Sequence, residues 1–183
     1  MSYDDYNAFM KVCSILGIVG SAICFFVQLV DPAFFVSHGY AYPENGYNYL
    51  YSGTTALFGS GTYRYLGLSN SAHFSGTPSS GALAFFIISI IAFGLGILAM
   101  VLLKRGTAPV ILIILLGLCA LGMIVGFFAN MSDNVIKEFA EANNYERLAL
   151  SRHPLHYLVV VANLLSILGF GYPAAAIIYY LFH

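Results

Sequence analysis

Two long apolar runs joined by a short basic link constrain this chain more than any other feature of its sequence. The runs Ala82–Leu103 and Ala108–Ala129 contain no charged residue. Each has about 22 residues, which at a rise of about 1.5 Å per residue crosses a hydrocarbon core of about 30 Å. Only residues 104–107, with the sequence Lys-Arg-Gly-Thr, separate the two runs. The region Gly81–Asn130 is therefore predicted to be a transmembrane hairpin.

The composition extends the membrane assignment to the whole chain. Of its 183 residues, 60% are apolar and 8% are charged, and the mean hydropathy is +0.82. These values lie outside the range of soluble domains. The apolar stretches predict spans at about 12–30, 82–103, 108–129 and 155–182, with outer loops at 31–80 and 131–154. We expect residues 1–183 to form a single all-α membrane domain, a four-helix bundle with a small extracytoplasmic cap that contains β-structure.

Small side chains recur at a spacing of four residues in two of the predicted spans. Gly17 and Ser21 form such a pair in the first span, and Gly122 and Gly126 form another in the third. This spacing places both small residues on one helix face, where a second helix backbone can approach closely. We expect these four residues at close helix contacts, within the chain or between copies. Asn163, in the last span, is expected to hydrogen bond to a neighbouring helix.

The first outer loop is rich in aromatic residues. Within it, tyrosines alternate with other residues on both sides of Gly59-Ser60-Gly61, which we interpret as a turn. The alternation predicts a small antiparallel sheet. Tyrosine also recurs at recognition surfaces, because it offers a large rigid ring and a hydroxyl. The residues predicted to contact a partner protein are Tyr47, Tyr49, Tyr51, Tyr63, Arg64 and Tyr65. The alternative is that some of these rings form the loop's own core.

The second outer loop shows a helical pattern. Between Asn134 and Ser151, apolar residues fall roughly on one side of a helix and charged residues on the other. This pattern predicts a short amphipathic helix that lies at the membrane interface or against the aromatic loop. A solvated connector is the alternative.

The basic residues predict an orientation. Lys104 and Arg105 occupy the short link, and Lys11 lies on the same side of the predicted membrane. Basic residues in short segments favour the cytoplasmic side. The basic residues of the other side are dispersed through longer segments, where they count for less: Arg64, Lys137, Arg147 and Arg152. We therefore expect a multi-pass protein of the plasma membrane with both termini in the cytoplasm.

Asp, Glu, Lys and Arg are missing from the predicted spans. Proteins that couple transport to ions keep such groups inside the bilayer, so ion-coupled transport is disfavoured, while an oligomeric channel or pore subunit stays open as an alternative. The sequence has no P-loop, GxGxxG, HExxH or CxxC motif, and we expect neither enzymatic activity nor a cofactor. A net charge of −1 offers no basic surface for nucleic acid.

Four histidines are weak candidates for metal ligands. His153 and His156 are three residues apart at the entrance to the last span, and His38 and His73 lie in the first loop. Pro154 interrupts the first pair, and the second pair is widely separated in sequence. We predict no metal site. A metal-binding accessory subunit of a larger membrane complex is the alternative that these residues leave open.

The layout resembles that of the claudin-like four-span proteins. A short N-terminus, a long outer loop, a very short inner link and a smaller outer loop follow in the same order. Members of that family carry a Gly-Leu-Trp signature followed by two cysteines. The closest local match here is Tyr-Leu-Gly-Leu-Ser at 65–69, in which Gly67 and Leu68 fit, Ser69 stands at the tryptophan position and neither loop cysteine has a counterpart. The resemblance implies a first loop that forms a small sheet on the bundle.

Taken together, these features predict a non-enzymatic integral membrane protein. It is expected to self-assemble, or to bind other membrane proteins, through its tyrosine-rich outer loop. A structural, adhesion or cell-junction role fits such contacts, and the expected partners are membrane lipid, further copies of the chain and other membrane proteins.

Overall fold

Four long helices dominate the structure, a computed structural model that describes residues 3–29, 35–37, 49–51, 53–65, 71–105, 108–131, 137, 141–142, 150–152 and 155–182. The helices are α1 (Tyr3–Leu29), α3 (Ser80–Lys104), α4 (Pro109–Met131) and α6 (Leu155–Phe182). Each contains a stretch long and apolar enough to cross a membrane: Ala8–Leu29, Ser80–Lys104, Pro109–Asn130 and Tyr157–Phe182. The prediction of four spans is confirmed, and the chain has the architecture of a multi-pass integral membrane protein.

The chain folds into two compact units, whose boundary falls within the long helices. The helical unit comprises Met1–Cys24, Ile87–Phe127 and Val160–His183. The sheet unit comprises Phe25–Phe86 and Phe128–Val159.

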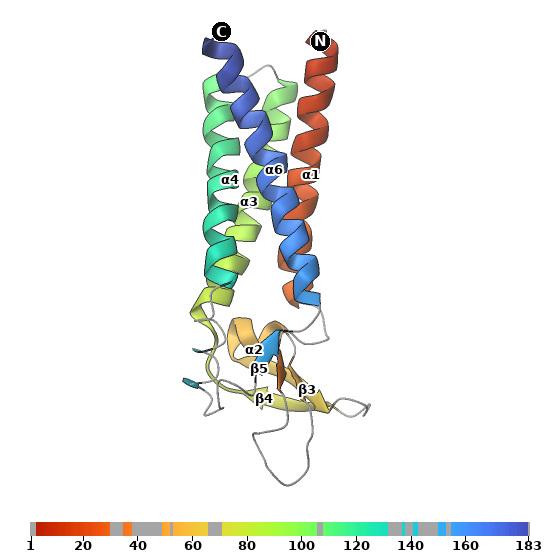
Figure 1. Cartoon of the computed structure of the whole chain (residues 1–183), viewed down its shortest axis with the longest axis vertical. Coiled ribbons are helices and arrows are strands. Elements are labelled where there is room, and N and C mark those ends of the chain that lie inside the picture. Colours follow the sequence, from red (N-terminus) through yellow and green to blue (C-terminus); the bar gives the residue numbers. More distant parts are fainter. Residues whose placement is uncertain are drawn as a thin grey trace. The chain divides into compact units, whose positions relative to one another are not determined.

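In the helical unit, both ends of the chain lie at the same end as the turn between α3 and α4 (Figure 1). Helix α3 ends at Lys104, where the amide of Arg105 bonds to the carbonyl of Leu102 at 3.0 Å. Helix α4 begins at Pro109, a residue suited to the first helical position because its missing N–H would have no partner there. Both cations of the predicted link are exposed.

The surface of the helical unit is apolar, and its interior holds the smaller and more polar side chains. Large exposed apolar residues occur on every long helix, among them Val19, Ile91, Leu121 and Leu168. The interior contains Ser14, Ser21, Ser89, Asn163 and Ser166 beside alanines and cysteines. This distribution suits lipid as the surrounding solvent, because helices in a bilayer associate through small residues and hydrogen bonds.

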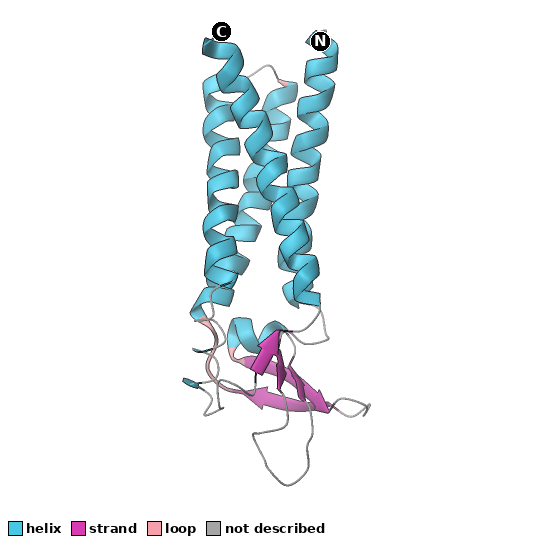
Figure 2. Cartoon of the chain, viewed as in Figure 1, coloured by secondary structure: helices cyan, strands magenta, loops and turns pink. Residues whose placement is uncertain are grey.

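The described part of the sheet unit contains a five-stranded sheet, drawn in magenta in Figure 2. Its strands are β1 (Phe35–Ser37), β2 (Tyr49–Tyr51), β3 (Ser60–Tyr65), β4 (Ser71–Ser75) and β5 (Leu150–Arg152). Their order is β4-β3-β2-β1-β5, and neighbouring strands pair antiparallel. The first loop therefore supplies four strands and the second loop supplies the fifth.

The segment Gly59-Ser60-Gly61 is not the turn that the sequence predicted. A short helix, α2 (Gly53–Phe58), fills most of the connection between β2 and β3, and Ser60 and Gly61 already belong to β3. Gly59 follows the helix with a φ of 67°, and its amide bonds to the carbonyl of Thr55 at 3.0 Å. Glycine takes this left-handed conformation at no steric cost, so it ends the helix and directs the chain into the strand.

The amphipathic helix predicted over Asn134–Ser151 is wrong at its C-terminal end. Leu150 and Ser151 belong to β5, which pairs with β1 at the edge of the sheet. Main-chain pairing with a strand distant in sequence outweighs the local helical pattern there. Further back, Lys137 and Glu141 are helical and form an exposed ion pair at 3.7 Å. The rest of the predicted helix lies outside the described residues.

Candidate functional site

Four of the predicted partner-binding tyrosines come together on the central strand pair. Tyr49 pairs with Tyr65, and Tyr51 pairs with Tyr63. Directly opposed residues of an antiparallel pair share a face, and so do residues two apart along a strand. All four tyrosines therefore belong to one face of the sheet. Tyr47 lies outside the described residues.

This tyrosine face continues across all five strands by register. Phe35 pairs with Tyr51 on one side, and Ala72 pairs with Tyr63 on the other. The positions of the tyrosine face are Phe35, Ser37, Tyr49, Tyr51, Gly61, Tyr63, Tyr65, Ala72, Phe74, Leu150 and Arg152. Six of these eleven positions are aromatic.

Arg64 belongs to the opposite face. It pairs with Leu50 on β2 and with Ser71 on β4. We call this side the hydroxyl face, because its positions on β3 and β4 are Ser60, Thr62, Arg64, Ser71, His73 and Ser75. Ser60, His73 and Ser75 are exposed. The register therefore separates Arg64 from the tyrosines with which the sequence analysis grouped it.

The hydroxyl face carries one serine–histidine contact. The Oγ atom of Ser60 lies 3.5 Å from Nε2 of His73, and both residues are exposed. Activation of a serine hydroxyl requires a shorter, oriented bond to the base, of about 2.6–3.2 Å. This contact is therefore a loose surface hydrogen bond.

The candidate metal ligands divide between several parts of the chain. His73 is on β4 and His156 is in the first turn of α6. His38 and His153 lie outside the described residues. Within the described ranges, no three His, Cys, Asp or Glu residues gather into a group that could hold a metal ion.

The pair Gly17 and Ser21 lies where α1 packs against α6, a contact that we call the α1–α6 seam. A methyl group at Gly169 would collide with the backbone nitrogen of Gly17 and lie 2.6 Å from its Cα. A methyl group at Gly20 would lie 2.5 Å from the carbonyl oxygen of Ala162. Both distances are far below the usual carbon contact of about 3.5–4.0 Å. Only glycine allows the two backbones to approach this closely.

Hydrogen bonds join the two helices of the seam. The Oγ of Ser166 in α6 donates to the carbonyl of Gly17 in α1 at 2.7 Å. The Oγ of Ser21 is within hydrogen-bond distance of two carbonyl oxygens of its own helix. It lies 3.1 Å from the carbonyl oxygen of Gly17 and 2.9 Å from that of Ile18. Serine hydroxyls commonly bond to a carbonyl three or four residues earlier in a helix. The seam therefore combines backbone contact with a hydrogen bond between helices.

Phe170 fills a slot between two glycines of different helices. Its ring carbons lie 2.7 Å from a methyl group placed at Gly17 of α1 and 2.7 Å from one placed at Gly96 of α3. The ring is fully buried. The missing side chains of the two glycines thus provide the volume that the phenyl ring occupies.

Gly122 has no comparable close contact. A methyl group there would meet Cγ2 of Ile88 at 3.5 Å, which is ordinary packing distance. Gly126, one turn further along α4, is buried. The same spacing of small residues thus occurs in α1 and in α4, with different surroundings at Gly17 and Gly122.

Asn163 bonds to a neighbouring helix, as predicted. Its Nδ2 atom donates to the carbonyl of Met123 in α4 at 3.3 Å, and the side chain is buried. Its Oδ1 atom has no hydrogen-bond partner in the structure. Asn163 therefore ties α6 to α4, while Ser166 ties α6 to α1.

Comparison with known proteins finds no matching family model, curated protein or solved structure.

Several residues of the seam and of the adjoining Phe170 slot escaped the sequence analysis. Gly96, Gly169 and Phe170 lie in apolar runs where glycine and phenylalanine are both common. A spacing of three to four residues between Ala162, Ser166 and Gly169 was the available signal. It does not reveal which glycine faces a ring and which faces a backbone.

Proposed function

We propose that this chain is a non-enzymatic integral membrane protein that assembles with further copies of itself, or with other membrane proteins, through the tyrosine face of its sheet. The observation that carries the proposal is the block of four tyrosines on β2 and β3, in which Tyr49 is opposite Tyr65 and Tyr51 is opposite Tyr63. Such a block offers a large apolar area together with four hydroxyl groups, the combination enriched at the centres of protein interfaces.

The topology proposed for this function places the sheet outside the cell. Lys104 and Arg105 are exposed at the end of the helical unit that also holds both chain ends (Figure 1). Basic residues in short segments favour the cytoplasm, so the loops that form the sheet would face outward. A plasma membrane location and an adhesion or junction role follow from the same argument. The resemblance of the layout to the claudin-like proteins points in this direction as well.

Arg64 has a separate role in the proposal. It occupies the hydroxyl face with Ser71 and Thr62, opposite the tyrosines. A partner that covers the tyrosine face therefore does not contact this face of the same sheet. Replacement of Arg64 is expected to leave assembly through the tyrosine face unchanged.

The test compares substitutions on the two faces. Tyr49→Ser with Tyr65→Ser removes one directly opposed pair, and Thr62→Ala with Arg64→Ala alters the hydroxyl face. Assembly is measured by the molecular mass in a gentle detergent and by chemical crosslinking in the native membrane. The proposal predicts loss of the assembled species for the tyrosine pair alone, with the circular dichroism spectrum unchanged. Monomeric native protein that crosslinks to nothing would contradict it.

A further inference from the structure

The short helix α2 lies outside the four apolar stretches and yet contacts two of the helices that contain them. At its N-terminal end, a methyl group at Gly53 would collide with the backbone carbonyl of Gln28, in the last turn of α1. At its C-terminal end, the carbonyl of Ala56 accepts a bond of 2.8 Å from the amide of Ser79, the residue before α3. Backbone contacts therefore fix both ends of α2 beside the ends of α1 and α3.

Four phenylalanines connect α2 with these two helices. The ring centroids are 4.3 Å apart between Phe26 and Phe25, 6.5 Å between Phe25 and Phe86, and 6.0 Å between Phe86 and Phe58. The last two pairs are edge-to-face, with interplanar angles of 81° and 87°. Aromatic pairs at these distances favour such geometry. We call this row, which runs from α1 over α3 to α2, the phenylalanine ladder.

The two rings at the ends of the ladder are exposed. Phe26 is 56% exposed and Phe58 is 53% exposed, while Phe25 and Phe86 between them are partly buried. Phe26 belongs to the apolar stretch Ala8–Leu29, whose exposed side chains face lipid when the helix crosses a membrane. The exposed ring of Phe58 is therefore linked, through Phe86 and Phe25, to a side chain that faces lipid.

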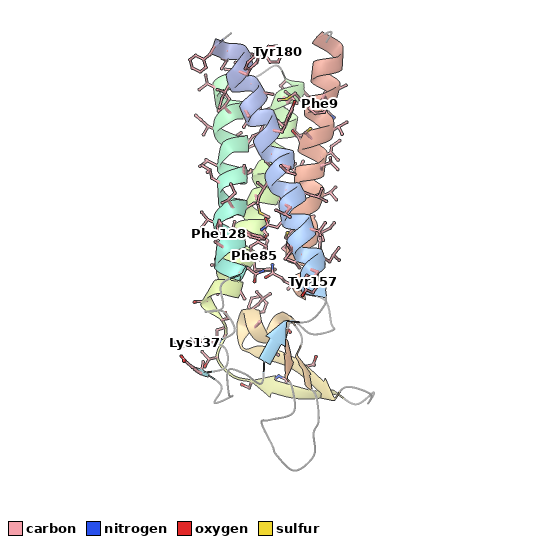
Figure 3. The ribbon with its side chains drawn as sticks, in the orientation of Figure 1. Phe9, Phe85, Phe128, Lys137, Tyr157 and Tyr180 are labelled. Carbon is pink, nitrogen blue, oxygen red and sulfur yellow. The ribbon has the colours of Figure 1, made fainter. Side chains whose placement is uncertain are left out.

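The depth of the ladder matches the boundary of the hydrocarbon. Phe26 lies three residues before the end of its apolar stretch, which is about 5 Å along the helix axis. Phe86 lies six residues after Ser80, the start of its stretch, or about 9 Å along the axis. A ring in contact with Phe86 is thus held within about two helical turns of the end of the span. Figure 3 shows Phe85, the buried neighbour of Phe86, in this first part of α3.

The chemistry of α2 suits this position. Its sequence, Gly-Thr-Thr-Ala-Leu-Phe, has no charge. Gly53, Thr55, Ala56 and Leu57 are buried, so Phe58 is the large side chain that the helix presents outward. Contact with lipid would remove apolar area from water without desolvating a charge.

We infer that α2 anchors the sheet unit to the membrane surface, with the ring of Phe58 inserted among lipid acyl chains at the hydrocarbon boundary. The ladder transmits this contact to α1 and α3, and the αL residue Gly59 then directs the chain from the anchored helix into β3. The anchor acts independently of the assembly proposed for the tyrosine face.

The absence of tryptophan from the sequence makes a direct test possible. A Phe58→Trp variant carries a single tryptophan, which can be excited at the red edge of its absorption, where tyrosine does not absorb. Reconstitution into vesicles of phosphatidylcholine brominated at shallow or deep acyl positions reports its depth. Two single-tryptophan controls bracket the result. Leu121→Trp, on the exposed side of α4, should be quenched by deep bromines, and His73→Trp, on the hydroxyl face, should be quenched by neither set.

The inference predicts that Phe58→Trp loses emission chiefly to the shallow bromines and resists iodide in the aqueous phase. It is overturned if Phe58→Trp behaves like His73→Trp while Leu121→Trp is quenched. Resistance to both bromine and iodide also overturns it, because that result means that protein covers the ring. A nitroxide attached to Phe58→Cys, in a chain whose native cysteines are alanine, provides a second variant: oxygen should relax it more than a water-soluble nickel complex.

Failure of the anchor and failure of the proposed assembly are distinguishable. The quenching experiment uses vesicles with a large excess of lipid, in which the chain is dilute, so it does not depend on contact between copies. The tyrosine-face variants retain Phe58 and should retain its quenching.

Discussion

The α1–α6 seam and the Gly122–Gly126 step of α4 carry the same sequence motif in different surroundings. In the seam, methyl groups at Gly20 and Gly169 would meet backbone atoms at distances that no folded protein accommodates without movement. At Gly122, a methyl group would meet a single isoleucine carbon at 3.5 Å. Small residues at a spacing of four therefore permit a close helix approach without requiring it. Whether a pair of small residues makes a close contact depends on the residues of the helix that faces it.

The chemistry around the two pairs explains the difference. In the seam, Ser166 donates a hydrogen bond to the carbonyl of Gly17, and this bond forms only when the two backbones are close together. Opposite Gly122 the neighbour within 4 Å is the Ile88 side chain, and no backbone atom comes that close. Gly122 therefore makes ordinary side-chain packing contact where Gly20 and Gly169 make backbone contact.

The largest expected effect is that of Gly20→Ala or Gly169→Ala. Each methyl group would meet main-chain atoms of the facing helix, which cannot rotate away. We expect a loss of more than about 3 kcal/mol, beyond the usual range for overpacked cores. Unfolding in a titration with sodium dodecyl sulfate, followed by circular dichroism, measures it. A loss similar to that of an exposed alanine substitution would show that the seam is looser than described.

A smaller loss is expected for Gly17→Ala. The added methyl group would meet the ring of Phe170, a side chain that can shift where a backbone cannot, and we expect a loss of about 1–3 kcal/mol. Phe170→Leu in the same chain should relieve part of the overlap. A double-mutant cycle measures this coupling, and additive losses would contradict the assignment of Phe170 to the slot.

Gly122→Ala should stabilise the protein, in contrast to the alanine substitutions at Gly17, Gly20 and Gly169. The methyl group finds ordinary contact distance, and alanine is the better helix former, so we expect stabilisation by about 0.5–1 kcal/mol. Gly94→Ala is the matched control, because a methyl group there would have no neighbour within 4 Å. Strong destabilisation of Gly122→Ala in dilute detergent would show that α4 approaches another backbone at this point.

The smallest expected effect is that of Ser166→Ala. It removes the hydrogen bond to Gly17 without adding volume, and bonds of this kind between membrane helices contribute about 0.6 kcal/mol on average. The same titration measures the change. Ser166→Cys, which restores a weak donor of similar size, should recover part of it, whereas equal losses for both variants would assign the effect to packing alone.

The sequence predicted those features that depend on local pattern. Uninterrupted apolar runs such as Ala108–Ala129 identified the four spans, because length and composition alone determine whether a helix can cross a bilayer. The alternating tyrosines predicted the pairing of β2 with β3. The sequence also indicated that Asn163 bonds to a neighbouring helix, because an amide in an apolar helix favours such a hydrogen bond.

The features that escaped prediction depend on segments distant in sequence. Three-residue strands such as β1 and β5 have too little pattern of their own and exist because they pair with each other. The place of Phe170 between Gly17 and Gly96 involves three helices. The strand register places Arg64 on the face opposite the tyrosines. The alternation of residues along β3 already implied this separation, but Arg64 was grouped with Tyr63 and Tyr65 because they are adjacent in sequence.

The proposed four-span topology predicts that the loops that contain the strands and the link between α3 and α4 are exposed on opposite sides of a membrane. Single cysteines at Ser75 and Arg105, both exposed in the structure, test it with a membrane-impermeant maleimide on intact cells. The three native cysteines lie within the apolar stretches of α1 and α4 and should give little background. The account predicts that Ser75→Cys reacts at once and that Arg105→Cys reacts only after permeabilisation. Reaction of both from the same side would contradict it.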